Sequence, residues 1–208
     1  MNSVAILAGG LATRFGGRDK SALVVDGRTI LERQIAELSS LSDDILLVGG
    51  PSHPRTRAVA DLIPGCGPLG GVHAALTAAR GDAVFVVACD MPYVTAPLGA
   101  YLLELAGNAD NADRADLVVP RTERGYHPLC AVYTRACLAP ITRRLGERRL
   151  ALKDLVVDGA DADLRARIVT VEDINRFGDA HRLFANVNTP AEYAGLKSTG
   201  AIQGHERQ

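Results

Sequence analysis

The chain has 208 residues, of which 47% are hydrophobic and 23% charged, a balance typical of one globular domain and not of a disordered chain. The formal net charge of −1 and a pI near 6.5 leave no global basic field to hold DNA or RNA, so nucleic acid is not an expected partner. The sequence has no run of about 18 apolar residues to cross a membrane and no visible signal peptide, so we expect a cytoplasmic protein.

The first half of the chain alternates short apolar runs with helical patterns. The run Val4–Leu7 predicts a buried strand that ends at a pair of glycines, and Thr29–Ser39 predicts a helix with Thr29 as its cap. The later elements expected in this half are a strand at Asp44–Val48, a helix at Leu69–Ala79 and a strand at Ala83–Ala88.

The second half keeps this alternation in a looser form. The elements expected here are a helix at Leu98–Ala106, strands at Asp116–Pro120 and Leu129–Tyr133, helices at Arg135–Leu145 and Leu150–Val156, and a short strand at Arg167–Val171. The order predicts a single-domain α/β fold, doubly wound and Rossmann-like, with a mostly parallel sheet and a mixed C-terminal portion. We place the domain at residues 1–196 and a disordered tail at residues 197–208.

A glycine-rich segment follows the first predicted strand. Gly9 and Gly10 let the backbone approach a ligand closely, and successive N–H groups can then surround an anion. Arg14 and Lys20 add positive charge to the same segment. The spacing matches neither G-x-x-x-x-G-K-[ST] nor G-x-G-x-x-G, so the segment is a phosphate-binding loop of another type. We predict that it binds a nucleoside triphosphate.

An acidic residue follows the strongest predicted strand, Ala83–Ala88. Asp90 comes two residues after that strand, so it is expected at the same sheet edge as the glycine loop. Mg²⁺ binds one or two carboxylates together with phosphate oxygens and water. Asp90 is therefore a candidate magnesium ligand beside the triphosphate, and the pair of features favours nucleotidyl transfer.

A third loop lies between Asp61 and Gly71, before the alanine-rich helix. Gly67 and Pro68 can bring backbone close to a flat base or a ribose. Asp61 could accept hydrogen bonds from the N1–H and amino group of guanine. The alternative interpretation is a rigid loop that caps the helix, and the residues alone do not choose between the two.

Four motifs stand together in this chain: L-A-G-G-x-x-x-R-x-G-G-x-x-K, G-P-L-G-G, C-D-M-P-Y and N-V-N-T-P. With them the sequence resembles the molybdenum cofactor guanylyltransferase family, within the wider nucleotidyltransferase group. The resemblance covers residues 1–196. It implies transfer of GMP from GTP to molybdopterin, with release of pyrophosphate and with Mg²⁺ as the cofactor.

The resemblance also implies roles for individual residues. Those expected to bind GTP are Leu7, Ala8, Gly9, Gly10, Lys20, Asp61, Gly67 and Asp90. Those expected to act in catalysis are Arg14, Lys20 and Asp90, with Asp90 as the metal ligand. On the acceptor side the resemblance places Asn186 and Asn188. His127, a lone histidine before a predicted strand, is a further candidate for the acceptor side, with a structural role as the alternative.

The segment Val48-Gly49-Gly50-Pro51 departs from the family pattern, because it lacks an asparagine that often contacts the nucleotide. The alternatives that stay open are a molybdopterin cytidylyltransferase, a sugar-phosphate nucleotidyltransferase and a nucleotide-binding adaptor without turnover. We expect a monomer with GTP and molybdopterin as substrates. A molybdenum-insertion protein and molybdoenzyme chaperones are the protein partners that the resemblance implies.

Overall fold

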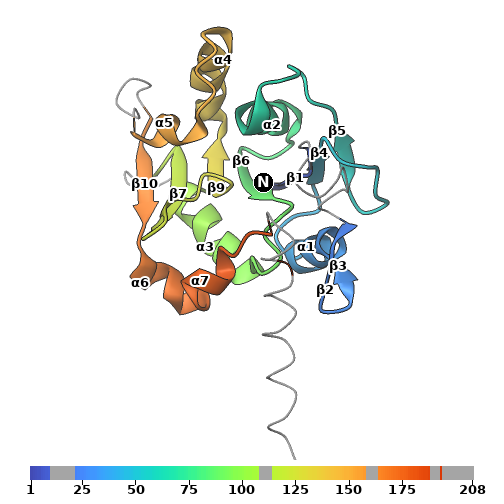
Figure 1. Cartoon of the computed structure of the whole chain (residues 1–208). Coiled ribbons are helices and arrows are strands. Elements are labelled where there is room, and N and C mark those ends of the chain that lie inside the picture. Colours follow the sequence, from blue (N-terminus) through green and yellow to red (C-terminus); the bar gives the residue numbers. More distant parts are fainter. Residues whose placement is uncertain (10–21, 108–113, 158–163, 188–192, 194–208) are drawn as a thin grey trace, which may run out of the picture.

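The computed structural model describes residues 1–9, 22–107, 114–157, 164–187 and Tyr193. One twisted sheet runs through this part of the chain, in the order β10-β7-β9-β6-β1-β4-β5, with β8 beside β7 (Figure 1). Its strands are β1 (Asn2–Leu7), β4 (Ile45–Val48), β5 (Arg57–Val59), β6 (Ala83–Ala88), β7 (Leu117–Thr122), β8 (Gly125–Tyr126), β9 (Cys130–Thr134) and β10 (Ala166–Val169). A separate hairpin pairs β2 (Val24–Val25) with β3 (Arg28–Thr29).

The sheet has a parallel half and a mixed half. Strands β5, β4, β1 and β6 are parallel neighbours. Strand β9 then runs antiparallel to both β6 and β7, while β10 is again parallel to β7. The predicted α/β class, with a mostly parallel sheet and a mixed C-terminal portion, is therefore confirmed.

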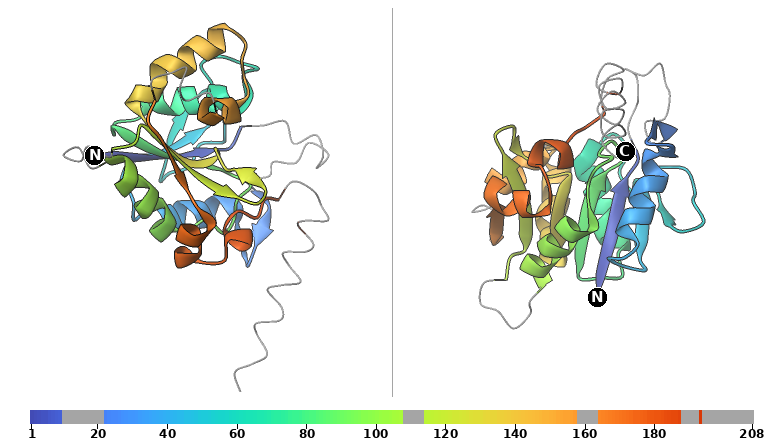
Figure 2. Two further views of the ribbon diagram at one scale, coloured as in Figure 1. Left: turned by 90° about the vertical axis from the view of Figure 1, so that its left-hand side faces the viewer. Right: turned by 90° about the horizontal axis from the view of Figure 1, so that it is seen from below.

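Helices cover both faces of the sheet, as the edge-on view in Figure 2 shows. On one face lie α1 (Ile30–Leu38), α3 (Ala96–Gly107), α6 (Val171–Ile174) and α7 (Ala180–Leu183), and on the other lie α2 (Gly67–Ala78), α4 (Leu138–Gly146) and α5 (Leu152–Val157). Two short 3₁₀ turns precede α4 and α7, at Arg135–Cys137 and Asn175–Phe177. Within the described ranges, the helices are too short or too polar to cross a membrane.

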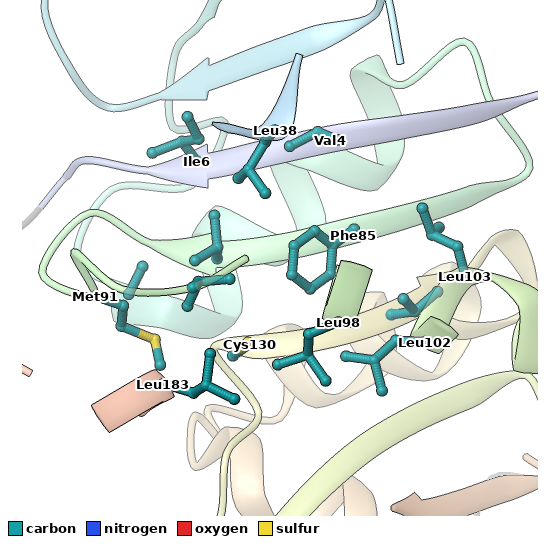
Figure 3. Close-up of a cluster of buried hydrophobic side chains, with 14 of the residues drawn as sticks. Val4, Ile6, Leu38, Phe85, Met91, Leu98, Leu102, Leu103, Cys130 and Leu183 are labelled. Atoms are coloured by element: carbon teal, nitrogen blue, oxygen red, sulfur yellow. The ribbon is translucent and has the colours of Figure 1, made fainter. Parts of the chain in front are cut away.

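Successive side chains of the central strands point to opposite faces of the sheet, so the hydrophobic core has two layers. Val4 and Ile6 of β1 pack with Phe85 of β6 against α1 and α3, in the cluster drawn in Figure 3. Ala5 and Leu7 point to the opposite face, against α2 and α4. Because both faces are covered by helices, the central strands are apolar at every position from Val4 to Leu7, which is why their sequence shows a continuous run.

The predicted elements are present, with shifts of a few residues at their ends. Thr29 caps α1 with a reciprocal capping box to Glu32, as a Thr at that position favours. Helix α2 begins at Gly67, two residues before the predicted start, because Pro68 is well suited to a first helical turn. The late strand ends at Val169 and not at Val171, because the Thr170 side chain accepts a hydrogen bond from the Asp173 N–H and starts α6.

Candidate active site

Three neighbouring strands end level with one another at the carboxyl edge of the sheet. Leu7 of β1 is paired in register with Val48 of β4 and with Ala88 of β6. The Ala8 and Gly9 N–H groups both donate to the Val48 carbonyl, at 2.9 and 3.1 Å, and the chain after β6 returns a hydrogen bond to the Leu7 carbonyl. The loops that follow β1, β4 and β6 therefore leave the sheet side by side, where ligands bind in open α/β sheets.

The first two of these loops touch through glycine backbones. Gly49 has a φ of +70°, and a Cβ at this position would lie 2.8 Å from the Gly9 Cα. A Cβ at Gly50 would lie 2.6 Å from the Cβ of Ala8. A side chain at Gly49 or Gly50, asparagine included, would therefore force the two loops apart.

An acidic side chain lies beside this glycine contact. The Oδ2 atom of Asp61 is 3.8 Å from the position that a Cβ of Gly9 would take, and 3.9 Å from that of Gly49. Strand β5 brings it there, because the Gly49 N–H donates to the Val59 carbonyl at 3.0 Å, two residues before Asp61. Asp61 itself is exposed. The structure thus brings Gly9, Gly49 and Asp61 together from three separate segments.

Helix α2 begins next to the same edge. Gly67 has a φ of +55° at its start, the residue before it makes no side-chain cap hydrogen bond, and its first turn contains no acidic residue. Further along, Gly71 packs against the side chain of Leu7, which a Cβ would approach to 3.4 Å. The first N–H groups of a helix are unpaired within it, and this end carries a partial positive charge, which suits a phosphate or a ribose hydroxyl.

Asp90 lies near the start of the third loop, two residues after β6, and is half-buried. Its carbonyl accepts a hydrogen bond of 2.9 Å from the Val187 N–H, which draws the exposed Asn186 to the same place. On the other side, Nε2 of the buried Gln34 in α1 donates to the Ala88 and Met91 carbonyls at 2.8 and 3.0 Å. The turn that carries Asp90 is therefore held by hydrogen bonds both from the C-terminal segment and from α1.

Sequence reasoning missed Gln34 and Val187 as supports of this turn. A signal for Gln34 was available, because it is a polar residue in the buried stripe of α1 formed by Ile30, Leu31, Ile35 and Leu38. A buried polar side chain needs hydrogen-bond partners, so its position predicts a contact with backbone. Nothing local marks Val187, whose role depends on a pairing across nearly a hundred residues.

The donor set at this edge fits a hard divalent cation held together with a nucleotide. Among the described residues, His, Cys, Asp and Glu form no group of three that could hold a metal by themselves. Mg²⁺ does not require such a group, because phosphate oxygens and water complete its shell around one or two carboxylates. Asp90 is half-buried and follows β6 at the same sheet edge as Gly9, so it can provide that minimum.

His127 has partners of its own within the fold. Its ring stacks on Phe184 with centroids 4.1 Å apart, and its Nε2 lies 2.7 Å from the Thr122 hydroxyl. Burial lowers the pKa of His127 to about 4, so the ring is neutral at pH 7. Its contact with the acceptor stays a prediction.

Four other predicted site residues, Gly10, Arg14, Lys20 and Asn188, lie outside the described residues, as does the predicted tail at 197–208.

Taken together, the sheet, its glycine turns and the two carboxylates at its carboxyl edge define an α/β enzyme of the nucleotidyltransferase class. Residues 4–161 match the model of the MobA-like NTP transferase domain. The chain belongs to this family, and it is a nucleotidyltransferase of molybdenum cofactor biosynthesis.

Two curated relatives support the assignment over almost the whole chain. The molybdenum cofactor guanylyltransferase of Desulfosudis oleivorans is 34% identical over 191 residues, which cover 90% of each chain. The probable molybdenum cofactor guanylyltransferase of Pelotomaculum thermopropionicum is also 34% identical over 191 residues, covering 90% of this chain and 87% of the relative.

A solved structure shows the same fold. The molybdopterin-guanine dinucleotide biosynthesis protein A of Archaeoglobus fulgidus superposes with a TM-score of 0.78 at 22% identity, covering 97% of this chain and all of that one. A cytidylyltransferase from Thermus thermophilus, which acts on 2-C-methyl-D-erythritol 4-phosphate, has a TM-score of 0.63 at 19% identity and covers 96% of this chain and 98% of that one. The sheet is thus shared by enzymes named for different bases.

Proposed function

We propose that this protein transfers GMP from GTP to molybdopterin and releases pyrophosphate, forming the molybdopterin guanine dinucleotide cofactor. The observation that carries the proposal is the meeting of Gly9, Gly49, Asp61 and Asp90 at one sheet edge. The names of the two relatives at 34% identity favour guanine as the base and molybdopterin as the acceptor.

In this proposal the nucleotide lies across the ends of β4, β1 and β6. Its base and ribose occupy the side of Asp61 and Gly67, where the bare backbones of Gly9 and Gly49 admit a flat group. The carboxylate of Asp61 accepts hydrogen bonds from the N1–H and the 2-amino group of guanine. Cytosine presents no such pair of adjacent donors, so this contact would select the base.

The triphosphate extends toward Asp90. Leu7, Ala8, Gly9 and Gly10 supply backbone to the phosphates, and Arg14 and Lys20 supply charge to them. Asp90 holds Mg²⁺, which when bound offsets the negative charge on the α-phosphate and on the departing pyrophosphate. The acceptor phosphate is already anionic near pH 7, so the protein contributes position and charge stabilisation and needs no strong general base.

The acceptor approaches from the side of the C-terminal segment. Asn186 supports this direction of approach, because the next residue, Val187, donates its N–H to the Asp90 carbonyl. Asn188 belongs to the same motif. Delivery of molybdopterin by a molybdenum-insertion protein, onward contact with molybdoenzyme chaperones, a monomeric state and a cytoplasmic location stay predictions.

The proposal is tested by pyrophosphate release from each of the four ribonucleoside triphosphates in the presence of molybdopterin and Mg²⁺. We expect release with GTP alone. Release with CTP alone would show a cytidylyltransferase, and tight binding of GTP without release would show an adaptor; either result overturns the proposal. A parallel reaction with Mg²⁺ chelated and then restored tests whether the cation is required.

The role of Asp61 is tested by removing its carboxylate from the protein and, separately, the 2-amino group from the nucleotide. Asp61→Ala should raise the KM for GTP by about tenfold or more, as expected for a lost hydrogen bond to a charged group. Inosine triphosphate lacks the 2-amino group, so the same substitution should raise its KM by a smaller factor. An equal factor for the two nucleotides would exclude a contact between Asp61 and the amino group.

A further inference from the structure

A cavity lies next to the candidate active site and shares with it the loop after β6. Its volume is about 690 Å³, within the range of small-molecule sites. Four segments line it: the turn of the β2–β3 hairpin, helix α1, the loop after β6, and the segment that leads into α7. These segments are far apart in the sequence. None of the residues that line the cavity has a role in the proposed GTP binding or metal binding.

Tyr93 lies in the wall of this cavity with two guanidinium groups over its ring. The Cζ atoms of Arg33 and Arg182 are 5.3 and 4.8 Å from the ring centroid. Arg33 is held in place, because its Nε donates to the Pro92 carbonyl at 2.9 Å and its Nη1 is 3.3 Å from an oxygen of Asp26. The wall therefore presents stacked planar groups, a surface that suits a flat conjugated ring.

The carboxylates of the cavity already have partners in the fold. Asp26 pairs with Arg33. Glu37 accepts the Ala96 N–H at the start of α3, and Asp179 accepts the Arg182 N–H at the start of α7.

The arginines of the cavity do not all have such partners. Arg28 and Arg182 are exposed, and neither forms an ion pair with any described residue. Three arginines and three acids line the cavity, so its formal charge is balanced. Because the acids accept hydrogen bonds from Arg33 or from backbone N–H groups, the guanidinium groups of Arg28 and Arg182 are the charged groups best placed to meet an anionic group of a ligand.

The cavity shares the loop after β6 with the place where chemistry is proposed. Tyr93 is three residues after Asp90, so the two lie at most about 11 Å apart along the chain. Val187 links them, because it packs in one buried cluster with Tyr93 and donates its N–H to the Asp90 carbonyl. A ligand with a phosphate at one end and a flat ring at the other could therefore reach both places.

We propose that this cavity is the acceptor subsite: Tyr93, Arg182 and Arg28 hold a flat, anionic heterocycle, the pterin part of the acceptor, while its phosphate reaches the Asp90 end. This inference rests on the proposed function. It assigns acceptor recognition to residues on the β2–β3 hairpin and α7, and it separates them from the residues that hold the nucleotide.

The test uses binding and turnover side by side. Pterin-6-carboxylate, a stable fluorescent heterocycle with an anionic group, serves as the binding probe, and GTP binding is measured on the same samples. The variants are Arg182→Gln and Arg28→Gln, which change exposed side chains that the core does not need. Arg167→Gln, an exposed arginine of β10 that does not line the cavity, is the matched control.

We expect each of the two cavity variants to weaken binding of the probe by about tenfold, as for a lost hydrogen bond to a charged group, with GTP affinity unchanged. In turnover they should raise the KM for molybdopterin by a similar factor and leave the KM for GTP alone. Arg167→Gln should match the parent protein in every measurement.

Two outcomes would overturn the inference. One is probe affinity in both cavity variants within twofold of the parent protein. The other is weakened probe binding with an unchanged KM for molybdopterin, which would show that the cavity serves another ligand. Failure of the proposed function has a different signature, namely no pyrophosphate release from GTP and molybdopterin by the parent protein.

Discussion

The two ends of the central strands β1 and β4 carry polar groups of opposite character. At the amino end, Asp44 is buried and its carboxylate is saturated within the protein: the Ser3 hydroxyl donates to it at 2.6 Å, the Arg80 N–H at 2.9 Å and Arg57 at 2.7 Å. At the carboxyl end, Asp61 is exposed and lies beside bare glycine backbone. At the amino end the polar groups bond to one another within the protein, whereas at the carboxyl end the Asp61 carboxylate is exposed to solvent.

The difference shows how a parallel sheet separates stability from function. Burial by itself would raise the pKa of Asp44, but the hydrogen bonds from Ser3, Arg80 and Arg57 outweigh it, so the pKa is lowered and the group stays charged. A charge in that setting stabilises only the fold. Residues at the amino end should therefore affect unfolding and not turnover, and residues at the carboxyl end the reverse.

The largest effect is expected from Asp44→Ala. The substitution removes the acceptor of the Ser3 hydroxyl and the Arg80 N–H and leaves the Arg57 guanidinium with only the Ala78 carbonyl, so the free energy of unfolding should fall by about 3–5 kcal/mol. Denaturant unfolding of the variant measures it. The neighbouring exposed Asp43→Ala is the control and should change the free energy by less than about 0.5 kcal/mol. A loss under 1 kcal/mol in Asp44→Ala would contradict a structural role for this end.

The second largest effect is expected on turnover, from a substitution at the carboxyl end of the strands. Asp90→Asn should lower kcat by about 100- to 1,000-fold, because a neutral amide holds a divalent cation poorly, while the free energy of unfolding changes by about 1 kcal/mol or less. Asp82→Asn is the matched control, since Asp82 is an exposed carboxylate just before the same strand, β6. If Asp82→Asn lowered kcat as much as Asp90→Asn, the separation of the two ends would be lost.

The third prediction concerns His127, which lies near the carboxyl end but has the contacts of a structural residue. Its folded pKa of about 4 is below the usual value of 6.5, so its contribution to stability is complete above pH 6.5 and is lost as the pH falls toward 4. The loss amounts to about 2–3 kcal/mol. His127→Phe keeps the stacking on Phe184 and removes the titration, so the parent protein should lose that much more stability than the variant between pH 7 and pH 4.

Urea unfolding of both proteins across this range measures the difference, and kcat at pH 7 shows whether the residue also acts in turnover. Equal pH dependence in the two proteins would contradict the depressed pKa. A large fall in kcat for His127→Phe would instead place the residue on the acceptor side.

The sequence predicted the central elements well because their patterns are local. Ala83–Ala88 is apolar throughout and rich in valine, and its predicted bounds are those of β6. Strand β5 was missed because Arg57–Val59 has three residues and only one large apolar side chain, and its pairing with β4 is what defines it. The β2–β3 hairpin was missed although Asp26-Gly27 is a strong turn signal, because each strand has only two residues.

The sheet-edge position of candidate residues was predictable where they directly follow strands. Asp90 and Gly9 were placed from their position after apolar runs, which is a property of parallel sheets. The approach of Gly49 to Gly9 was not predictable, because it depends on the register between β1 and β4. The cavity around Tyr93 was also invisible, since Arg33 and Arg182 are separated by about 150 residues in sequence and are joined only by folding.

The smallest predicted effect tests whether the glycine contact itself matters at the carboxyl end. Gly49 and Gly27 both have positive φ, +70° and +81°, so replacing either by alanine costs about 1 kcal/mol of backbone strain. A Cβ at Gly27 meets nothing within 4 Å, whereas one at Gly49 would be 2.8 Å from the Gly9 Cα. Only Gly49→Ala must therefore push the first loop away from Asp61. We expect Gly49→Ala to weaken GTP binding by about tenfold and Gly27→Ala to leave it unchanged, with a larger loss of stability in Gly49→Ala because the clash with Gly9 adds to the backbone strain. Equal GTP affinities, measured by calorimetry, would show that the loops tolerate separation and that the carboxyl end does not depend on this contact.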